Sequence, residues 1–321
     1  MRIGSNPEKE KFTKILYKKH RVIIPVYIPD SKDGYFNNLF DVFKASINSL
    51  LSTINVNDTN ISIINNNCKH EVTDYINNLL EQKLIDKHIV YKENYGKVFS
   101  ILSEARASYE DFISIADADV FYFNGWENKV FTIFNSFYKA GVVSPVPAPY
   151  LAFYNNVSLF GNLFKLPKKG NVVAPNSFKY LEEGINNPNI FHHKKYDWKK
   201  EQFHLKKNNT TACVGCGHFV ATYRNIFKNF EILQPKYVFK DGDENYYLDS
   251  QFDKLGYSRL STLETKAYHL GNTVPTWVHE YVFEVGAVAN TIQQSEKLNS
   301  NSSTYLLKKI IFKILKKINI I

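Results

Sequence analysis

The sequence is short of cysteine and has neither a leader-like segment nor a long apolar run. Its three cysteines, Cys68, Cys213 and Cys216, are too few for a disulfide framework, so a reducing, cytoplasmic setting is expected. Residues 1–20 mix acidic and basic side chains and contain no apolar run of about seven residues, so no secretory signal is expected. No window of about 18 uncharged apolar residues occurs, which argues against a membrane-spanning helix.

The chain does have a large apolar content and an excess of positive charge. Of its 321 residues, 44% are hydrophobic and 15% are aromatic, which is enough for a substantial core and argues against disorder. The formal net charge is +9. This charge favours an anionic partner, such as a nucleotide, an acidic membrane surface or a nucleic acid, but does not choose among them.

Short apolar runs alternate with segments of helical periodicity over the first 120 residues. Strands are predicted at 21–28, 61–64, 88–91 and 112–115, and helices at 35–53, 72–84 and 98–108. Such alternation predicts right-handed crossovers and a mostly parallel sheet covered on both faces. We therefore predict an α/β fold in which the first half of the chain is of the nucleotide-binding type.

The second half is less regular. A helix is predicted at 126–139, a short strand at 141–144 and a final strand at 258–269. Residues 150–209 are aromatic, basic and loop-like. Because a loop of this length is uncommon inside a compact domain unless it is functional, we expect substrate contacts there.

The segment Phe112–Tyr122 ends an apolar strand in two carboxylates, Asp117 and Asp119. In an open α/β sheet the ligand crevice lies at the carboxyl ends of the strands. Acids at that position can hold a divalent cation that bridges phosphate oxygens, so Asp-Ala-Asp predicts a metal–diphosphate clamp. The alternative is a strand that enters a turn, where aspartate is common.

Five acidic residues form a second cluster: Asp241, Asp243, Glu244, Asp249 and Asp253. A carboxylate such as Asp243 or Glu244 could remove the proton from an attacking hydroxyl group. The alternative is a solvated helix start, where acids complement the helix dipole.

Several loose motifs follow one another in a characteristic order. They are the strand segment Ile24-Pro-Val-Tyr27, Asp117-Ala-Asp119, the glycine-bearing segment Gly215–Arg224, Asp243-Glu244 before Leu248 and Gly256-Tyr257, and the late His269. In this order they resemble a GT-A-fold, family 2-like glycosyltransferase over about residues 20–272. The resemblance implies a GT-A-type Rossmann-like domain and transfer of a sugar, a hexosyl or N-acetylhexosaminyl group, from a nucleotide-diphosphate donor to a hydroxyl acceptor. Inversion at the sugar carbon is expected.

The resemblance also implies roles for individual residues. It places Mn²⁺ or Mg²⁺ on Asp117 and Asp119, with His269 either a third ligand or a structural histidine. The expected donor, a UDP-sugar, would be bound by Pro25, Tyr27, Asn65, Asn66, Asp117, Ala118 and Asp119. Apart from the resemblance, Lys97 could contact a phosphate, and the alternative is an exposed lysine that only aids solubility. The base would be Asp243 or Glu244, and the family's Glu-Asp pair corresponds in spacing to Glu244-Asn245.

The pattern Cys213-Val-Gly-Cys216-Gly-His218 contains half of a zinc site. A second half is missing, so we favour small residues that pack within a strand. His218 could still contact the acceptor.

Beyond the core we predict a basic extension at 1–20, a catalytic domain at 21–290 that divides after residue 120, a linker at 291–304 and a basic amphipathic helix at 305–321. The apolar face of this helix would consist of Leu307, Ile310, Ile311, Ile314, Leu315 and Ile318. The other face would carry Lys308, Lys309, Lys313, Lys316 and Lys317. Such a helix fits the surface of an anionic membrane, and the alternative is a helix docked on the core or on another subunit.

Two other function classes stay open. A nucleotidyltransferase on a related fold would be expected to carry a glycine-rich basic loop after the first strand, whereas residues 28–34 contain one glycine. A catalytically silent protein that binds glycan or nucleic acid is the other class. Retained acids at both sites favour the transferase, acting in surface polysaccharide or lipid-linked glycan synthesis at the inner face of the cell membrane, with no nucleic-acid partner.

Overall fold

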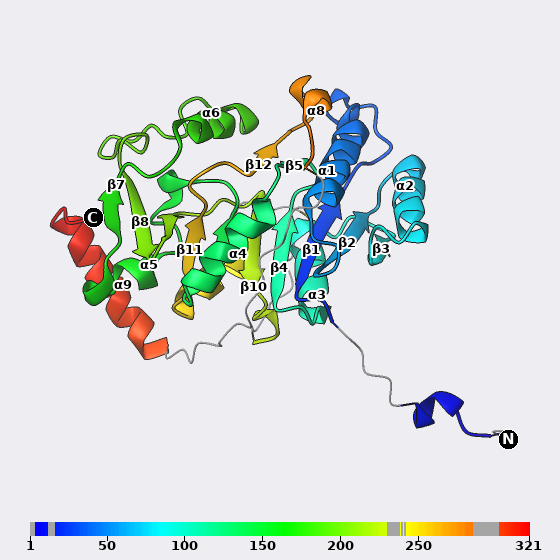
Figure 1. The fold of residues 1–321 in the computed structure, drawn as a ribbon, viewed down its shortest axis with the longest axis horizontal. Helices are drawn as coiled ribbons and strands as arrows, with labels where there is room; N and C mark the ends of the chain where they lie inside the picture. Colours follow the sequence, from blue (N-terminus) through cyan, green and yellow to red (C-terminus); the bar gives the residue numbers. More distant parts are fainter. Residues whose placement is uncertain (1–3, 12–16, 230–237, 239, 241, 285–301) are drawn as a thin grey trace.

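The computed structural model of the chain describes residues 4–11, 17–229, 238, 240, 242–284 and 302–321. Within these residues one sheet has the strand order β3-β2-β1-β4-β10-β6-β11-β9-β8-β7 (Figure 1). Its strands are β1 (His20–Val26), β2 (Thr59–Asn66), β3 (Lys87–Tyr91), β4 (Phe112–Ala116), β6 (Ala140–Ser144), β7 (Lys168–Gly170), β8 (Gln202–Lys207), β9 (Thr210–Val214), β10 (Val220–Arg224) and β11 (Ser258–Ser261). A separate small sheet pairs β5 (Val120–Tyr122) with β12 (Ala267–His269).

Strand direction divides the large sheet. β1 pairs in parallel with β2 and β4, β2 pairs in parallel with β3, and β6 pairs in parallel with β11. β10 lies antiparallel between β4 and β6, and β9, β8 and β7 continue the sheet as an antiparallel meander. Among the described strands, β10, β9 and β7 thus run against the other seven, which confirms the predicted mixed α/β fold with a mostly parallel sheet.

Helices cover both faces of the sheet because the central strands are apolar on both faces. In β1, Val22 and Ile24 belong to the core cluster that includes α1 (Leu39–Thr53), α2 (His70–Glu81) and α4 (Trp126–Ser136). Ile23 points into the opposite cluster, which includes α3 (Lys97–Ala107) and α7 (Ser250–Lys254). Side chains that alternate between faces in this way bury both sides of a strand.

The expectation of a loop at 150–209 is wrong. This region contains most of η3 (Pro149–Leu151), together with α5 (Val157–Phe160), η4 (Leu163–Lys165), β7, α6 (Pro175–Gly184) and β8. Its elements are too short to show a helix or strand period, and buried aromatic side chains such as Phe160, Phe191 and Trp198 hold them to the core. The expected final strand at 258–269 is likewise divided into β11 and β12. The remaining short elements are η1 (Pro7–Glu10), η2 (Gly34–Phe36), η5 (Phe227–Asn229), the π-helical turn η6 (Asn245–Asp249) and α8 (Trp277–Glu280).

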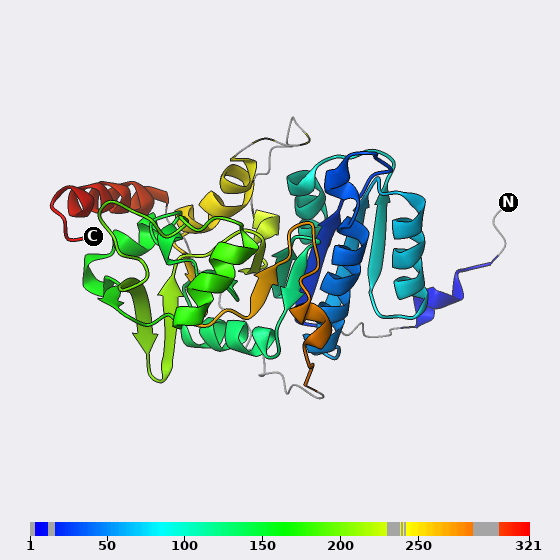
Figure 2. The ribbon, with the colours of Figure 1, turned by 90° about the horizontal axis from the view of Figure 1, so that it is seen from above.

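The predicted C-terminal helix forms as α9 (Ser302–Lys317) and packs on the protein. Figures 1 and 2 show it beside α5, at the end of the molecule opposite α2. Ile311 and Leu315 face the core, which corrects their assignment to a free apolar face. Most of the predicted linker, through residue 301, lies outside the described residues. Within the described part of the chain, no helix is long and apolar enough to cross a membrane.

Candidate active site

A cleft of about 830 Å³ opens at the carboxyl ends of β1 and β4. Parallel strands direct their carboxyl ends to one edge of the sheet, so the segments that follow them meet there. The predicted residues that line the cleft are Pro25, Tyr27, Asn66, Lys97, Asp117, Ala118, Asp119 and His269. Asn65 is not among its lining residues. Its side-chain oxygen accepts a hydrogen bond from the Cys68 backbone N–H at 2.8 Å, and its amide nitrogen donates to Thr73 at 2.9 Å.

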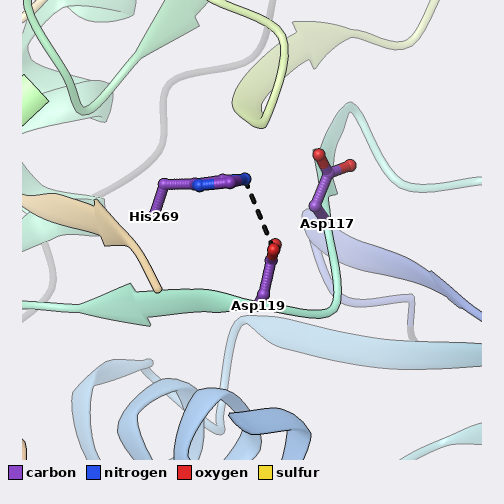
Figure 3. Close-up of side chains that lie close together, drawn as sticks. All are labelled: Asp117, Asp119 and His269. Carbon is purple, nitrogen blue, oxygen red and sulfur yellow. Dashed lines mark ion pairs between the residues drawn. The ribbon is translucent and has the colours of Figure 1, made fainter. Parts of the chain in front are cut away.

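Asp117, Asp119 and His269 all line this cleft, and their side chains lie close together (Figure 3). Each offers one ligand atom within 4.8 Å of the others, and this is the only such group of three or more histidine, cysteine or acidic side chains among the described residues. Strand pairing brings them together, because β5 follows Asp119 directly and Val120 pairs with His269 across the small sheet. Nε2 of His269 lies 3.3 Å from Oδ2 of Asp119.

A backbone carbonyl fixes the orientation of His269. Nδ1 of His269 lies 2.9 Å from the carbonyl oxygen of Gly184, at the end of α6. A carbonyl can only accept, so Nδ1 carries the proton and Nε2 is left to face Asp119. A methyl group at position 184 would approach the His269 carbonyl oxygen to 3.0 Å, so the glycine permits this close contact. Gly184 lies in the region expected to be a loop, and no sequence signal connected it to His269.

Asp119 is short of partners. Its Oδ1 is buried and has no hydrogen-bond partner among the described residues. Burial raises the pKa of Asp119 to about 6, and although His269 acts against this rise, Asp117 adds to it. A buried carboxylate oxygen without a donor is destabilising unless a cation compensates it. Oxygen and imidazole ligands with an orphaned carboxylate oxygen therefore fit a divalent cation such as Mn²⁺ or Mg²⁺.

Lys97 links the two acidic groups of the site. Its ammonium group forms an ion pair with Asp117 and lies 2.6 Å from the carboxylate of Glu244. Burial acts to lower the pKa of Lys97, but Asp117 and Glu244 raise it well above its usual value. The structure thus brings the predicted base region to the predicted metal clamp through one lysine. Lys97 begins α3 directly after Gly96, whose φ of 82° is the left-handed conformation that favours glycine.

Other residues form the wall of the cleft next to the acidic group. The side chain of Tyr27 is 40% exposed and its ring is perpendicular to that of Phe36, with centroids 6.2 Å apart. The Asn66 side-chain oxygen accepts a hydrogen bond from the Tyr95 backbone N–H at 2.9 Å. Asn66 therefore braces the segment that leads to Lys97.

The second acidic cluster separates into residues with different surroundings. Asp243 and Glu244 are partly exposed at the start of η6, whereas Asp249 and Asp253 are buried. Asp253 accepts hydrogen bonds from the backbone N–H groups of Val157 and Ser158 at the start of α5, which is a structural role. Asp241 lies outside the described residues.

The cysteines are buried or half-buried thiols. Burial raises the pKa of Cys213 and Cys216 to about 12 and that of Cys68 to about 11, which disfavours the thiolate that metal binding needs. The described part of the chain places no third ligand beside them. Small residues packed near a turn explain the motif better, because a side chain at Gly215 would collide with the Ala148 carbonyl oxygen.

Comparisons with known proteins give a distant structural likeness. No model of a known protein family matches the chain, and no curated protein matches it. Among solved structures it is similar to S. aureus TarS 1–349, with 11% identity, a TM-score of 0.44, and coverage of 78% of this chain and 59% of that one. The complex of TarS 1–349 with UDP-GlcNAc gives 11% identity and a TM-score of 0.45, covering 82% of this chain and 61% of that one.

A mannosyltransferase is also among the similar structures. PcManGT from Pyrobaculum calidifontis, in complex with GDP-Man and Mn²⁺, shares 12% identity at a TM-score of 0.44 over 78% of this chain and 56% of that one. This chain thus spans less than two thirds of each of these solved chains.

Proposed function

We propose that this protein is a metal-dependent glycosyltransferase that moves a sugar from a nucleotide-diphosphate donor to a hydroxyl acceptor. One observation carries the proposal: Asp117, Asp119 and His269 meet in a cleft at the carboxyl ends of parallel strands, with an oxygen of Asp119 orphaned. This is where an open α/β sheet binds its ligand. The sequence resemblance and the mannosyltransferase among the similar structures agree with it.

Asp117, Asp119 and His269 would hold Mn²⁺ or Mg²⁺. A cation there would stabilise the negative charge that develops on the leaving diphosphate. Lys97, on the same wall of the cleft, adds a fixed positive charge that a diphosphate can approach. When the donor binds, we expect Lys97 to exchange part of its contact with Asp117 for a phosphate oxygen.

The donor would lie along the cleft wall. Pro25, Tyr27 and Ala118 offer apolar and aromatic surface to a base and ribose, and Asn66 offers an amide. A UDP-sugar is the donor we propose. Asn65 does not line the cleft, so we propose only an indirect role in donor binding for it. Its hydrogen bonds to Cys68 and Thr73 support the segment that contains Asn66.

The proton of the acceptor hydroxyl would pass to Glu244 or Asp243. Glu244 is the stronger candidate because Lys97, which forms an ion pair with Asp117, also contacts the Glu244 carboxylate, and this supports a position for Glu244 near the proposed metal. Direct inverting displacement needs a base on the face of the sugar opposite the diphosphate. We propose that the reaction inverts the sugar carbon.

We also propose that α9 holds the enzyme on an anionic membrane at the cytoplasmic face, where a lipid-linked or polysaccharide acceptor is presented. Although one edge of α9 is docked, Leu307, Ile310, Ile314 and Ile318 form an adjacent apolar stripe, each 52–60% exposed. Beside this stripe lie Lys309, Lys313 and Lys317, all exposed. Every ionisable side chain of the α9 segment that follows Tyr305 is a lysine, so its charge complements an anionic lipid surface.

Donor hydrolysis tests the central proposal without knowledge of the acceptor. The protein is incubated with Mn²⁺ and a panel of UDP- and GDP-sugars, and the products are followed by mass spectrometry. Slow release of nucleoside diphosphate and free sugar is expected, and a chelator should stop it. Parallel reactions with nucleoside triphosphates and sugar 1-phosphates test nucleotidyl transfer, whose product is pyrophosphate. Pyrophosphate release alone, or turnover that persists in excess chelator, would contradict the proposal.

A further inference from the structure

A second group of aromatic and polar side chains lies beside the metal site in the later half of the chain. His218 immediately precedes Phe219, whose carbonyl oxygen accepts a hydrogen bond from the Asp117 backbone N–H at 2.8 Å. The ring of Phe219 also packs edge-on against His269, with centroids 5.2 Å apart. The chain therefore passes from His218 directly to the residue that contacts two of the metal-site residues.

The buried ion pair of Asp249 and Arg259 contacts the side chain of His218. Nδ1 of His218 lies 2.8 Å from Oδ2 of Asp249, and the other oxygen of Asp249 binds Arg259. Asp249 and Arg259 are fully buried, whereas the His218 side chain is 31% exposed. Because a buried ion pair adds little net stability, this pair is better explained by the position that it gives to the partly exposed imidazole. With Nδ1 facing Asp249, Nε2 is the nitrogen available to a ligand.

The surroundings of His218 suit a sugar. The ring of Tyr154 meets the imidazole edge-on with centroids 5.3 Å apart. Next to Tyr154, the Asn155 amide donates to the side-chain oxygen of Asn245 at 2.8 Å, and Asn245 follows Glu244. An aromatic face can cover the C–H face of a pyranose, while imidazole and amide groups serve its hydroxyls.

We propose that Tyr154 and His218 form the acceptor subsite, and that the acceptor group is itself a sugar. The pyranose ring packs on Tyr154, and one of its hydroxyls donates a hydrogen bond to Nε2 of His218. This contact holds the acceptor ring in the subsite next to Glu244. The role of Tyr154 and His218 in the reaction rests on the proposed glycosyl transfer. Their binding of a sugar does not depend on that proposal.

The kinetic test uses the full chain with Mn²⁺, the active donor and methyl glycosides of glucose, galactose and N-acetylglucosamine. His218→Phe keeps a ring against Tyr154 but removes both nitrogens. It should raise the KM of the preferred glycoside about 3–10-fold, the effect of losing one hydrogen bond, and change kcat less than about 2-fold. Donor hydrolysis in the absence of glycoside should stay at the wild-type rate. His218→Gln should recover part of the affinity, because its amide oxygen can accept the same hydrogen bond.

The control is His70→Phe. His70 also pairs with an aspartate, Asp74, at 3.3 Å, but on the exposed surface of α2, so this change should alter no constant. A His218→Phe enzyme with an unchanged KM, or with donor hydrolysis reduced in step with transfer, would overturn the subsite. Saturation-transfer NMR of the glycosides with the wild type and Tyr154→Leu tests binding directly. Loss of the wild-type signal in the variant is expected, and equal signals would overturn the proposal even if no donor were ever turned over.

Discussion

Asp249 and Asp119 each lie beside a histidine in the interior of the protein, and their charges are balanced in different ways. Asp249 is completely buried, and burial alone would raise its pKa, but Arg259 and then His218 lower the pKa below its usual value. Asp119 is less buried and has His269 at 3.3 Å, yet burial raises its pKa to about 6. The more deeply buried carboxylate is therefore the one that holds its charge more firmly.

The difference lies in the source of the compensating cation. The fold supplies Asp249 with the Arg259 guanidinium group in direct contact with one oxygen and with His218 at 2.8 Å from the other, although this second oxygen makes no hydrogen bond of good geometry among the described residues. Asp119 has a second carboxylate nearby, and one of its oxygens has no partner among the described residues. We therefore expect the site of Asp119 to be completed by a cation from outside, whereas the fold already supplies a cation to Asp249. We therefore assign Asp119 to cation binding and Asp249 to support of the fold and of His218.

The largest effect should come from removing Asp119. Asp119→Ala should abolish transfer and metal-dependent donor binding, a loss of at least about 10³-fold because a catalytic cation stabilises the transition state by several kcal/mol. Asp117→Ala should cause a smaller loss of transfer and of donor binding. The fold should be retained, as judged by thermal unfolding. Among the described residues, His269 is the only one whose ion pair would be lost with Asp119. Asp74→Ala, which removes the aspartate of an exposed Asp–His pair, is the control. An active Asp119→Ala enzyme would contradict the proposal that Asp119 binds a catalytic metal.

Glu244 should come next. Glu244→Gln keeps the shape of the side chain but loses the charge that pairs with Lys97. Loss of a general base should reduce kcat by about 10²–10⁴-fold and leave donor affinity nearly unchanged. Asp243→Asn should reduce kcat less than Glu244→Gln does. Steady-state kinetics measure the change in kcat, and isothermal titration calorimetry measures the affinity for the donor. Normal turnover in both variants would make the acidic cluster a helix start only.

Removal of Asp249 should destabilise the fold more than removal of Asp119 or Glu244. Asp249→Ala leaves Arg259 buried without its partner, and breaking one side of a buried ion pair costs about 3–5 kcal/mol. Urea unfolding of Asp249→Ala and Asp119→Ala, side by side, measures the contrast. Equal stability of the two variants would show that the buried pair does not support the fold as we infer.

Protonation sharpens the same comparison. In the folded protein without metal, the pKa of Asp119 is raised from 3.8 to about 6. The folded state then binds more protons than the unfolded state between about pH 4 and pH 6. The stability linked to protonated Asp119 is therefore complete below about pH 4 and is lost as the pH rises through 6.

Asp119→Asn, which stays neutral, should keep this stability. In chelator it should be roughly 1–3 kcal/mol more stable than the wild type at pH 7 and equal to it at pH 4. Urea unfolding at both pH values provides the measurement. Mn²⁺ should then stabilise the wild type and not the variant. A variant without any advantage at pH 7 would mean that Asp119 is better compensated than its surroundings indicate.

The contrast between these two aspartates was only partly visible in the sequence. Asp117 and Asp119 follow a buried strand, and a local pattern of this kind predicts a site because strand ends meet at one edge of a sheet. The partners of Asp249 are His218, 31 positions before it, and Arg259, ten positions after it, and no local pattern connects them. For the same reason the parallel first half of the sheet was predictable. In contrast, β8 and α6 are held by aromatic contacts of Phe203 and Phe178 with residues well separated in sequence, and β7 is held by its pairing with β8.

The helix α9 offers the smallest effect and a further version of the comparison, since one of its faces has a partner in the fold and another does not. Phe312 packs near Phe153 and Phe160, and Tyr305 donates a hydrogen bond to Asp253 at 3.4 Å, so deleting the helix would uncover the core. A test of membrane binding must therefore change only the exposed stripe. We choose Ile310→Gln combined with Ile314→Gln.

These substitutions should leave the thermal midpoint unchanged and weaken sedimentation with vesicles of anionic lipid about tenfold, because two exposed isoleucines lose their apolar contact with the lipid. Leu80→Gln combined with Leu84→Gln, which alters exposed apolar residues at the other end of the molecule, should change nothing. Attachment of the wild type should also weaken with salt, since each exposed lysine near an anionic surface contributes roughly 1 kcal/mol. If the wild type ignores anionic vesicles at low salt and instead sediments as a dimer that the α9 substitutions dissociate, the exposed stripe is an interface between copies of this chain.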